Sequence, residues 1–167
     1  DGRRFERQGP VGPADDGFAY RAPQISVVDG ARLVLTCTRF EIAGDDTLFD
    51  PDSEALQRAE LCLFWSQDAG HTWTEEPQIV DVDLPRERYN WNSAGQLLIL
   101  RPDRWIWPLE TWKPPGYDGP PDQRAWALFS ADGGASWGEL TVVANDPAGH
   151  RLYWDQMNCR LDDGRLY

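Results

Sequence analysis

The feature that most constrains this chain is an eight-residue stretch that occurs twice. The copies run from Ser66 to Trp73 and from Ser130 to Trp137, and both read Ser-x-Asp-x-Gly-x-Ser/Thr-Trp. In such a stretch the Asp can accept hydrogen bonds from backbone N–H groups a few residues on, and the Gly tolerates a positive φ. Apolar, strand-like runs flank each copy. Each copy therefore predicts a tight turn between two antiparallel strands.

A second landmark repeats with nearly the same period. The two turn stretches are 64 residues apart, and a Gly that starts an apolar strand recurs at Gly30, Gly95 and Gly164, with spacings of 65 and 69. This period suits one four-stranded sheet with long loops, since compact propeller repeats take ~40–50 residues. The sequence therefore predicts an all-β fold built of repeated four-stranded antiparallel units, with two units and the start of a third.

The repeated stretch resembles the Asp-box of the sialidase superfamily, whose β-propellers carry it between the third and fourth strands of a blade. The resemblance implies a propeller, six-bladed when complete, with the missing blades downstream. We expect blade 1 at about 20–82, blade 2 at about 86–146 and the start of blade 3 at about 151–167. Residues 1–19 are read either as a surface segment or as a strand that closes the last blade. Because the Asp-box lies away from the propeller axis, it indicates fold rather than function.

Local signals fill in the blades. Asp29-Gly30 and Asp163-Gly164 predict hairpin turns between apolar runs. Residues 41–60 interrupt the first blade, and a short helix is predicted at 54–59, with Asp52 or Ser53 as its cap.

Composition excludes some partners. The chain has 28 acidic and 16 basic residues and a net charge of −12, which argues against nucleic acid or an anionic membrane as the main partner. The sequence contains no run of ~20 apolar residues, the length that a membrane-spanning helix needs. It does not indicate where the protein is located. Cys37 and Cys62 fall on neighbouring predicted strands, where we expect buried free thiols rather than a disulfide. We expect no cofactor and no metal, because the carboxylates and cysteines lack ligand spacing.

The first candidate site residue opens the first inner strand. Tyr20-Arg21-Ala22-Pro23 resembles the Phe/Tyr-Arg-Ile-Pro motif of sialidases, and the resemblance implies that Arg21 belongs to a cluster of arginines that holds the substrate carboxylate. A planar fork of donors matches a carboxylate, which is the physical reason for Arg at this position. Ala22 departs from the usual Ile.

The same resemblance implies a second arginine and an acid. In sialidases the next strand ends in an Arg, and an Asp about six residues later acts as acid/base. Here these are Arg39 and either Asp45 or Asp46. A carboxyl near other carboxylates, or away from water, has a raised pKa and can protonate a leaving glycosidic oxygen. The alternative is that both are solvated loop acids.

Two further sets lie near the predicted axis. One set is aromatic and charged and comprises Trp91, Arg104, Trp105, Trp107, Glu110 and Trp112. Because sugar rings stack on indole, its residues either form a platform for a sugar or pack between blades. Asp155, Gln156 and Asn158 begin the third inner strand, and they either bind a ligand or satisfy buried backbone groups.

The resemblance implies a glycoside hydrolase that acts by a retaining mechanism on a terminal, acidic sugar of a carbohydrate or glycoconjugate. The Tyr nucleophile that sialidases use, its Glu partner and the remaining arginines are expected beyond Tyr167. The alternative is a non-catalytic propeller that binds carbohydrate or protein through the same funnel.

Overall fold

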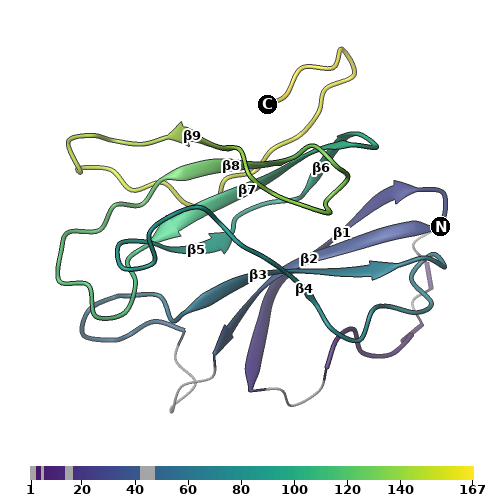
Figure 1. The fold of residues 1–167 in the computed structure, drawn as a ribbon, viewed down its shortest axis with the longest axis horizontal. Helices are drawn as coiled ribbons and strands as arrows, with labels where there is room; N and C mark the ends of the chain where they lie inside the picture. The colour runs from purple at the N-terminus through teal and green to yellow at the C-terminus, as the bar shows by residue number, and fades with distance from the viewer. Residues whose placement is uncertain (1–2, 5, 14–16, 42–47) are drawn as a thin grey trace.

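The computed structural model describes residues 3–4, 6–13, 17–41 and 48–167, and this part of the chain contains strands and turns but no helix. The strands form two antiparallel sheets (Figure 1). Sheet 1 has the order β1-β2-β3-β4, made of β1 (Phe18–Asp29), β2 (Arg32–Glu41), β3 (Ala59–Ser66) and β4 (Gln78–Val80). Sheet 2 has the order β5-β7-β8-β9 with β6 also beside β7, made of β5 (Asn90–Ser93), β6 (Leu98–Arg101), β7 (Arg104–Trp112), β8 (Ala125–Ser130) and β9 (Leu140–Ala144). The all-β prediction is confirmed.

The first strand of each sheet is interrupted at a similar place. In sheet 1 the register of β1 against β2 shifts between Arg21 and Gln24, where Ala22 has a φ of 51°. In sheet 2 β5 and β6 pair with the two ends of one edge of β7, and residues 94–97 leave the ladder between them. Pro108 of β7 faces this gap: its carbonyl accepts one hydrogen bond from there, and it has no N–H to donate.

The core lies between the two sheets. Alternate residues of β2 and β3 face sheet 2, and alternate residues of β7 and β8 face sheet 1, as the period of a strand requires. The buried side chains from sheet 1 and the segment after β4 are Val34, Leu61, Leu63, Val80 and Val82; those from sheet 2 are Trp91, Leu97, Trp105, Trp107, Leu109, Trp126 and Leu128. At ~1.5–3 kcal/mol per fully buried large apolar side chain, this interface is a main source of stability.

The two Asp-box turns close with the same hydrogen bonds. In the first turn the Asp68 carboxylate accepts the N–H of Thr72 at 2.8 Å and its hydroxyl at 2.6 Å, while the Ser66 hydroxyl accepts the N–H of Gly70 at 2.8 Å. The corresponding distances in the second turn are 2.8, 2.5 and 2.9 Å. The Thr72 hydroxyl and N–H lower the pKa of Asp68 to about 2. Both turns join the strands predicted, β3 to β4 and β8 to β9.

The helix predicted at 54–59 does not form. Asp50 instead accepts the N–H groups of Asp52 and Ser53 at 3.0 and 2.8 Å, which makes a turn without a helix after it. The N–H of Leu56 bonds across to the carbonyl of Lys113 at 3.0 Å, and Leu56 is buried. This tertiary pairing outweighs the weak helix propensity of six residues.

The third unit consists of irregular chain. The turn at Asp163-Gly164 is present, and Cys159 and Tyr167 exchange backbone hydrogen bonds at 2.8 and 2.9 Å around it. The third inner strand expected around Asp155, Gln156 and Asn158 does not form, since residues 152–159 contain no strand. In Figure 1 the yellow C-terminal end lies beyond sheet 2, on the side away from sheet 1, and before it the N–H of Asp155 binds Glu110 of β7. Sheet 2 thus has packing partners on both sides.

The N-terminal residues pack on the other face of sheet 1. Residues 6–13 form no strand, and Gly12 lies so close to Phe64 that a Cβ there would be 2.7 Å from the ring. Below this ring Cys37 and Cys62 are directly opposite on β2 and β3, buried and unbridged. The prediction of free, buried thiols at these two positions is confirmed.

Candidate functional site

The connections that follow β2, β4 and β7 lie at one end of the molecule, which we call the loop end. It carries 48–58, 81–89 and 113–124, whereas the Asp-box turns lie at the opposite end, the box end. The two sheets contact each other at this end, because Asn90 of β5 donates to the carbonyls of Leu56 and Gln57 in the connection between β2 and β3, at 2.8 and 2.6 Å. Since loops carry most binding and catalytic residues, a site is expected here.

Glu110 is the most buried carboxylate at the loop end, with 2% of its surface exposed. Its Oε1 accepts hydrogen bonds from Asn92 Nδ2 at 3.1 Å and from Trp112 Nε1 at 2.8 Å. Its Oε2 accepts the backbone N–H of Asp155 at 2.6 Å. No cation of the described residues lies within ion-pair distance. The carboxylate therefore joins the third unit to sheet 2 and is committed to protein donors.

This junction repeats the one between the two sheets. Thr38 of β2 occupies the position of Glu110 in its own sheet, and its hydroxyl accepts the backbone N–H of Ser93 at 2.9 Å. Ser93 in turn corresponds to Asp155. Each unit thus receives the first strand of the next unit through one side-chain acceptor at an equivalent place. The repetition covers three successive units of the chain.

An aromatic hollow opens beside this junction. It has a volume of about 540 Å³ and includes Phe49, Trp112 and Trp154 in its wall. The Trp112 and Trp154 rings stack with centroids 5.9 Å apart and planes 21° apart, and Trp154 is 51% exposed. Polar groups around the aromatic rings come from Asp50, Ser53, Glu54, Lys113 and Gln123. Stacked indoles with a polar surround are chemically suited to a sugar ring.

Arg21 and Arg39 have different environments. Arg21 lies on β1 opposite Thr38 and is exposed. Arg39 pairs with Glu60, whose Oε2 lies 2.8 Å from its Nε and 2.7 Å from an Nη, and its guanidinium stacks on Phe18 at 4.0 Å. Burial would lower the pKa of Arg39, but the hydrogen bonds that Arg39 makes to Glu60 and Tyr20 raise it. Arg39 is thus neutralised within the protein.

Three of the tryptophans considered as a sugar platform are core residues. Trp91 is 1% exposed, and Trp105 and Trp107 are fully buried, so their indole faces contact protein. The guanidinium of Arg86 covers the Trp91 ring at 3.4 Å. For these three positions the packing alternative holds, whereas Trp112 lines the aromatic hollow.

Arg104 lies at the box end, six residues along β7 from Glu110 and therefore about 20 Å away at ~3.3 Å per residue. It pairs with Glu139 of the second Asp-box turn at 3.2 Å. In the described residues Arg104 and Glu110 therefore lie at opposite ends of β7, and the part of Arg104 in a ligand site stays a prediction.

Of the remaining candidates, Asp155 is exposed and has a φ of 55°, and its N–H is the group that binds Glu110. The carbonyl of Gln156 lies so close to Gly95 that a Cβ there would be 2.5 Å from it, and its side-chain Oε1 is buried without a hydrogen-bond partner among the described residues. Asp45 and Asp46 lie outside the described residues. Sequence reasoning gave Trp154 no role, although it adjoins Asp155 in the same inner-strand motif.

Comparisons with known proteins assign no family. No protein-family model matches the chain, and no curated protein matches it significantly. Within the described residues no three His, Cys, Asp or Glu side chains are grouped so that they could hold a metal ion. The described part of the chain also contains no helix with the length and apolar character needed to span a membrane.

Proposed function

We propose that this chain is part of a sialidase-like β-propeller and acts as a glycoside hydrolase on a terminal, acidic sugar. The observation that carries the proposal is the repeated junction, in which Thr38 binds Ser93 and Glu110 binds Asp155. Units that meet through equivalent contacts are related by a recurring rotation, and such a rotation arranges sheets around an axis. The matching Asp-box turns, which lie far from the junction, support the same arrangement.

The recurring rotation has a consequence for the loop end. Arg21 and Asn92 precede the equivalent positions Ala22 and Ser93 on β1 and β5, and Trp154 precedes Asp155 in the irregular third unit, so all three would face the axis. In the proposal Arg21 binds the sugar carboxylate through its planar donors. The aromatic hollow contacts the apolar face of the sugar or of its neighbour. Asp45 or Asp46 protonates the glycosidic oxygen as the bond to the anomeric carbon breaks.

A non-catalytic carbohydrate-binding propeller is the second candidate. It is favoured by the pairing of Arg39 with Glu60, which leaves one of the two expected arginines without free charge for a substrate. The aromatic hollow would serve such a module equally well, because stacking needs no acid.

Hydrolysis of aryl sialosides and aryl glucuronides tests the proposal, with Asp45→Asn and Asp46→Asn as variants. Asp52→Asn is the matched control, since this acid is exposed in the same connection. We expect one of the two variants to lose about 10²–10⁴-fold in kcat, the usual contribution of general acid catalysis, while the control retains activity. Saturable binding of these glycosides without turnover would support the binding module. Turnover that survives in both variants would refute the assigned acid.

A further inference from the structure

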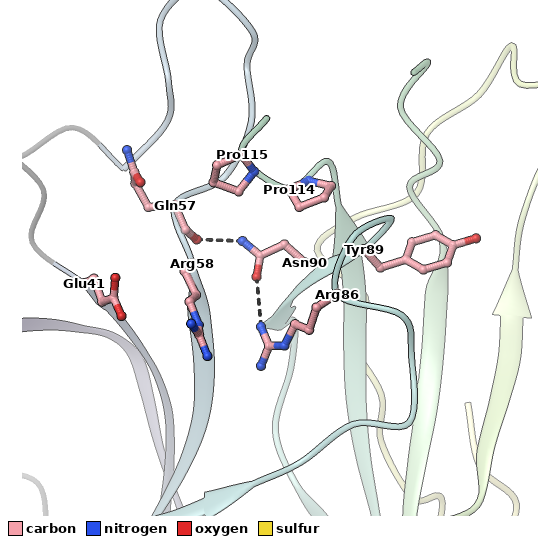
Figure 2. Close-up of a pocket in the computed structure, with 8 residues that line it drawn as sticks. All are labelled: Glu41, Gln57, Arg58, Arg86, Tyr89, Asn90, Pro114 and Pro115. Carbon is pink, nitrogen blue, oxygen red and sulfur yellow. Dashed lines mark hydrogen bonds between the residues drawn. The ribbon is translucent and has the colours of Figure 1, made fainter. Parts of the chain in front are cut away.

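A second hollow lies between the sheets at the loop end and contains two arginines. It has a volume of about 450 Å³, within the usual range of ligand sites. Figure 2 shows the side chains of Arg58 and Arg86 entering the same space, with Glu41 at its margin. We call it the arginine hollow; its wall is completed by Gln57, Tyr89, Asn90, Pro114 and Pro115.

Arg86 is held in position before any ligand arrives. Its Nη1 donates to the carbonyl of Ala59 at 2.8 Å and to Asn90 Oδ1 at 3.4 Å, and its guanidinium lies 3.4 Å from the centre of the Trp91 ring. Asn90 is itself fixed, because its Oδ1 also accepts the N–H of Ala59 at 3.2 Å and its Nδ2 donates to two carbonyls. A donor fixed in this way loses little conformational entropy when it binds a ligand.

The charges of these two arginines are unpaired within the described residues. No carboxylate oxygen there lies within 4.0 Å of either guanidinium, and Nε and the second Nη of Arg86 make no hydrogen bond. Glu41 lines the hollow without forming an ion pair, and the charges of Glu60 and Asp81 raise the pKa of Arg86 although neither carboxylate is within ion-pair distance of it. Other arginines at this end do have carboxylate partners: Arg39 with Glu60, and Arg88 and Arg124 with Asp122.

The electrostatic cost of this arrangement is visible at Arg86. Burial, and then the charge of Arg58, lower the pKa of Arg86 to about 10. The guanidinium therefore remains charged at neutral pH while half-buried beside a like charge. An anion that entered the hollow would neutralise this charge and accept the unused N–H groups, which protein groups of the described chain do not do.

We propose that Arg58 and Arg86 form a binding site for an oxyanion, a carboxylate or a sulfate carried by a ligand. Both groups present two coplanar oxygens to a guanidinium edge, the geometry in which Arg binds anions most strongly. The Asn90 side chain and the two prolines lie in the remaining wall, whereas the Tyr89 ring points away from the hollow (Figure 2) and donates its hydroxyl to Asp122. The site is separate from Arg21 and needs no hydrolytic step, so it can stand if the proposed hydrolase activity fails.

Nuclear magnetic resonance of the arginine Nε–H groups tests this directly, because each guanidinium gives its own signal. The protein is titrated at constant ionic strength, with sodium chloride as the balancing salt, using sodium sulfate, sodium acetate, glucuronate and glucose 6-sulfate, with glucose as the neutral probe. We expect a saturable shift of the Arg86 signal with the anions and none with glucose. Comparison of glucuronate with glucose 6-sulfate identifies which oxyanion the site prefers.

Arg86→Gln and Arg58→Gln are each expected to weaken anion binding by at least 10-fold. Arg88→Gln is the matched control, because Arg88 lies on the same connection but pairs with Asp122. Arg58 is exposed, so Arg58→Gln keeps the test valid if loss of the Arg86 contacts unfolds the chain. The proposal is overturned if the anions act no differently from chloride, or if Arg88→Gln weakens binding as much as Arg58→Gln.

Discussion

The two Asp-box glycines offer a matched pair of substitutions. Gly70 and Gly134 have nearly the same φ, 90° and 87°, so an Ala side chain is strained to the same degree at both. Their surroundings differ. A Cβ at Gly70 would lie 3.4 Å from Leu33 Cδ1, whereas a Cβ at Gly134 would lie 2.6 Å from Trp105 Cζ3 and 3.0 Å from Cε3. The pair therefore separates backbone strain from steric overlap.

The magnitude follows from these contacts. Left-handed backbone costs an L-residue about 1–2 kcal/mol, which is the loss of unfolding free energy expected for Gly70→Ala. Trp105 is fully buried and donates its Nε1–H to the carbonyl of Pro102 at 3.2 Å, so its ring cannot move aside freely. Overpacking of a core adds about 1–3 kcal/mol, so Gly134→Ala is expected to cost about 2–5 kcal/mol in total.

Urea denaturation followed by circular dichroism measures the loss of unfolding free energy in both variants. In thermal unfolding each kcal/mol lowers the Tm of a chain of this size by about 2–4 °C, so the Tm values of the two variants should differ by several degrees. The Trp105→Leu background supplies the control, because Leu33 is the residue at the equivalent position of sheet 1. In that background Gly134→Ala should cost about as much as Gly70→Ala does in the unmodified protein. Equal losses for the two Ala variants in the unmodified protein would refute the steric argument.

Three other predictions address the junction, the turn carboxylates and the thiols. Glu110→Gln places an amide donor among three donors and should cost about 1–3 kcal/mol; hydrogen exchange at the Asp155 amide should accelerate, and unchanged exchange would contradict the junction. The depressed pKa of Asp68 means that its carboxylate stabilises the fold above about pH 4 and loses this effect as the pH falls toward 2; the Tm gap between the unmodified protein and Asp68→Asn should therefore narrow over that range, and a gap that widens would contradict the assignment. Ellman's reagent should titrate only the exposed Cys159 in the native chain and all three thiols after unfolding; reaction of a strand thiol in the native state would disprove its burial.

The parts of the fold that could be predicted from sequence are those fixed by neighbouring residues. The Asp-box turns depend on contacts within four positions, such as Asp68 with Thr72, and a local pattern contains all of that information. The Asp-Gly turn at Gly164 is equally local. The positions of the buried strands could be predicted from apolar runs, because the signal for such a strand lies in the side chains of the strand itself.

The candidate site depended on contacts that no local pattern contains. Trp91 and Trp112 are both tryptophans near the ends of paired strands, yet the former faces sheet 1 and is buried while the latter lines a hollow. Which face meets another sheet is decided by packing between units. Arg86 and Arg58 come from different connections and carried no motif, so only the assembled sheets bring them into one hollow. The helix at 54–59 failed for the same reason, since a pairing with a distant loop replaced it.

The position of Pro108 bears on how sheet 2 finds its alignment during folding. Paired strands that slide by two residues keep the same side chains on the same face, so burial alone does not prevent such a slip. A proline in a central strand changes this, because it has no N–H for a carbonyl of the neighbouring strand. Only a register that places the proline beside residues outside the ladder leaves no carbonyl without a donor. The break after β5 supplies that stretch. Pro108 thus disfavours pairings of β7 that are shifted by two residues, and it reduces the number of alternative registers of similar stability that sheet 2 can form during folding.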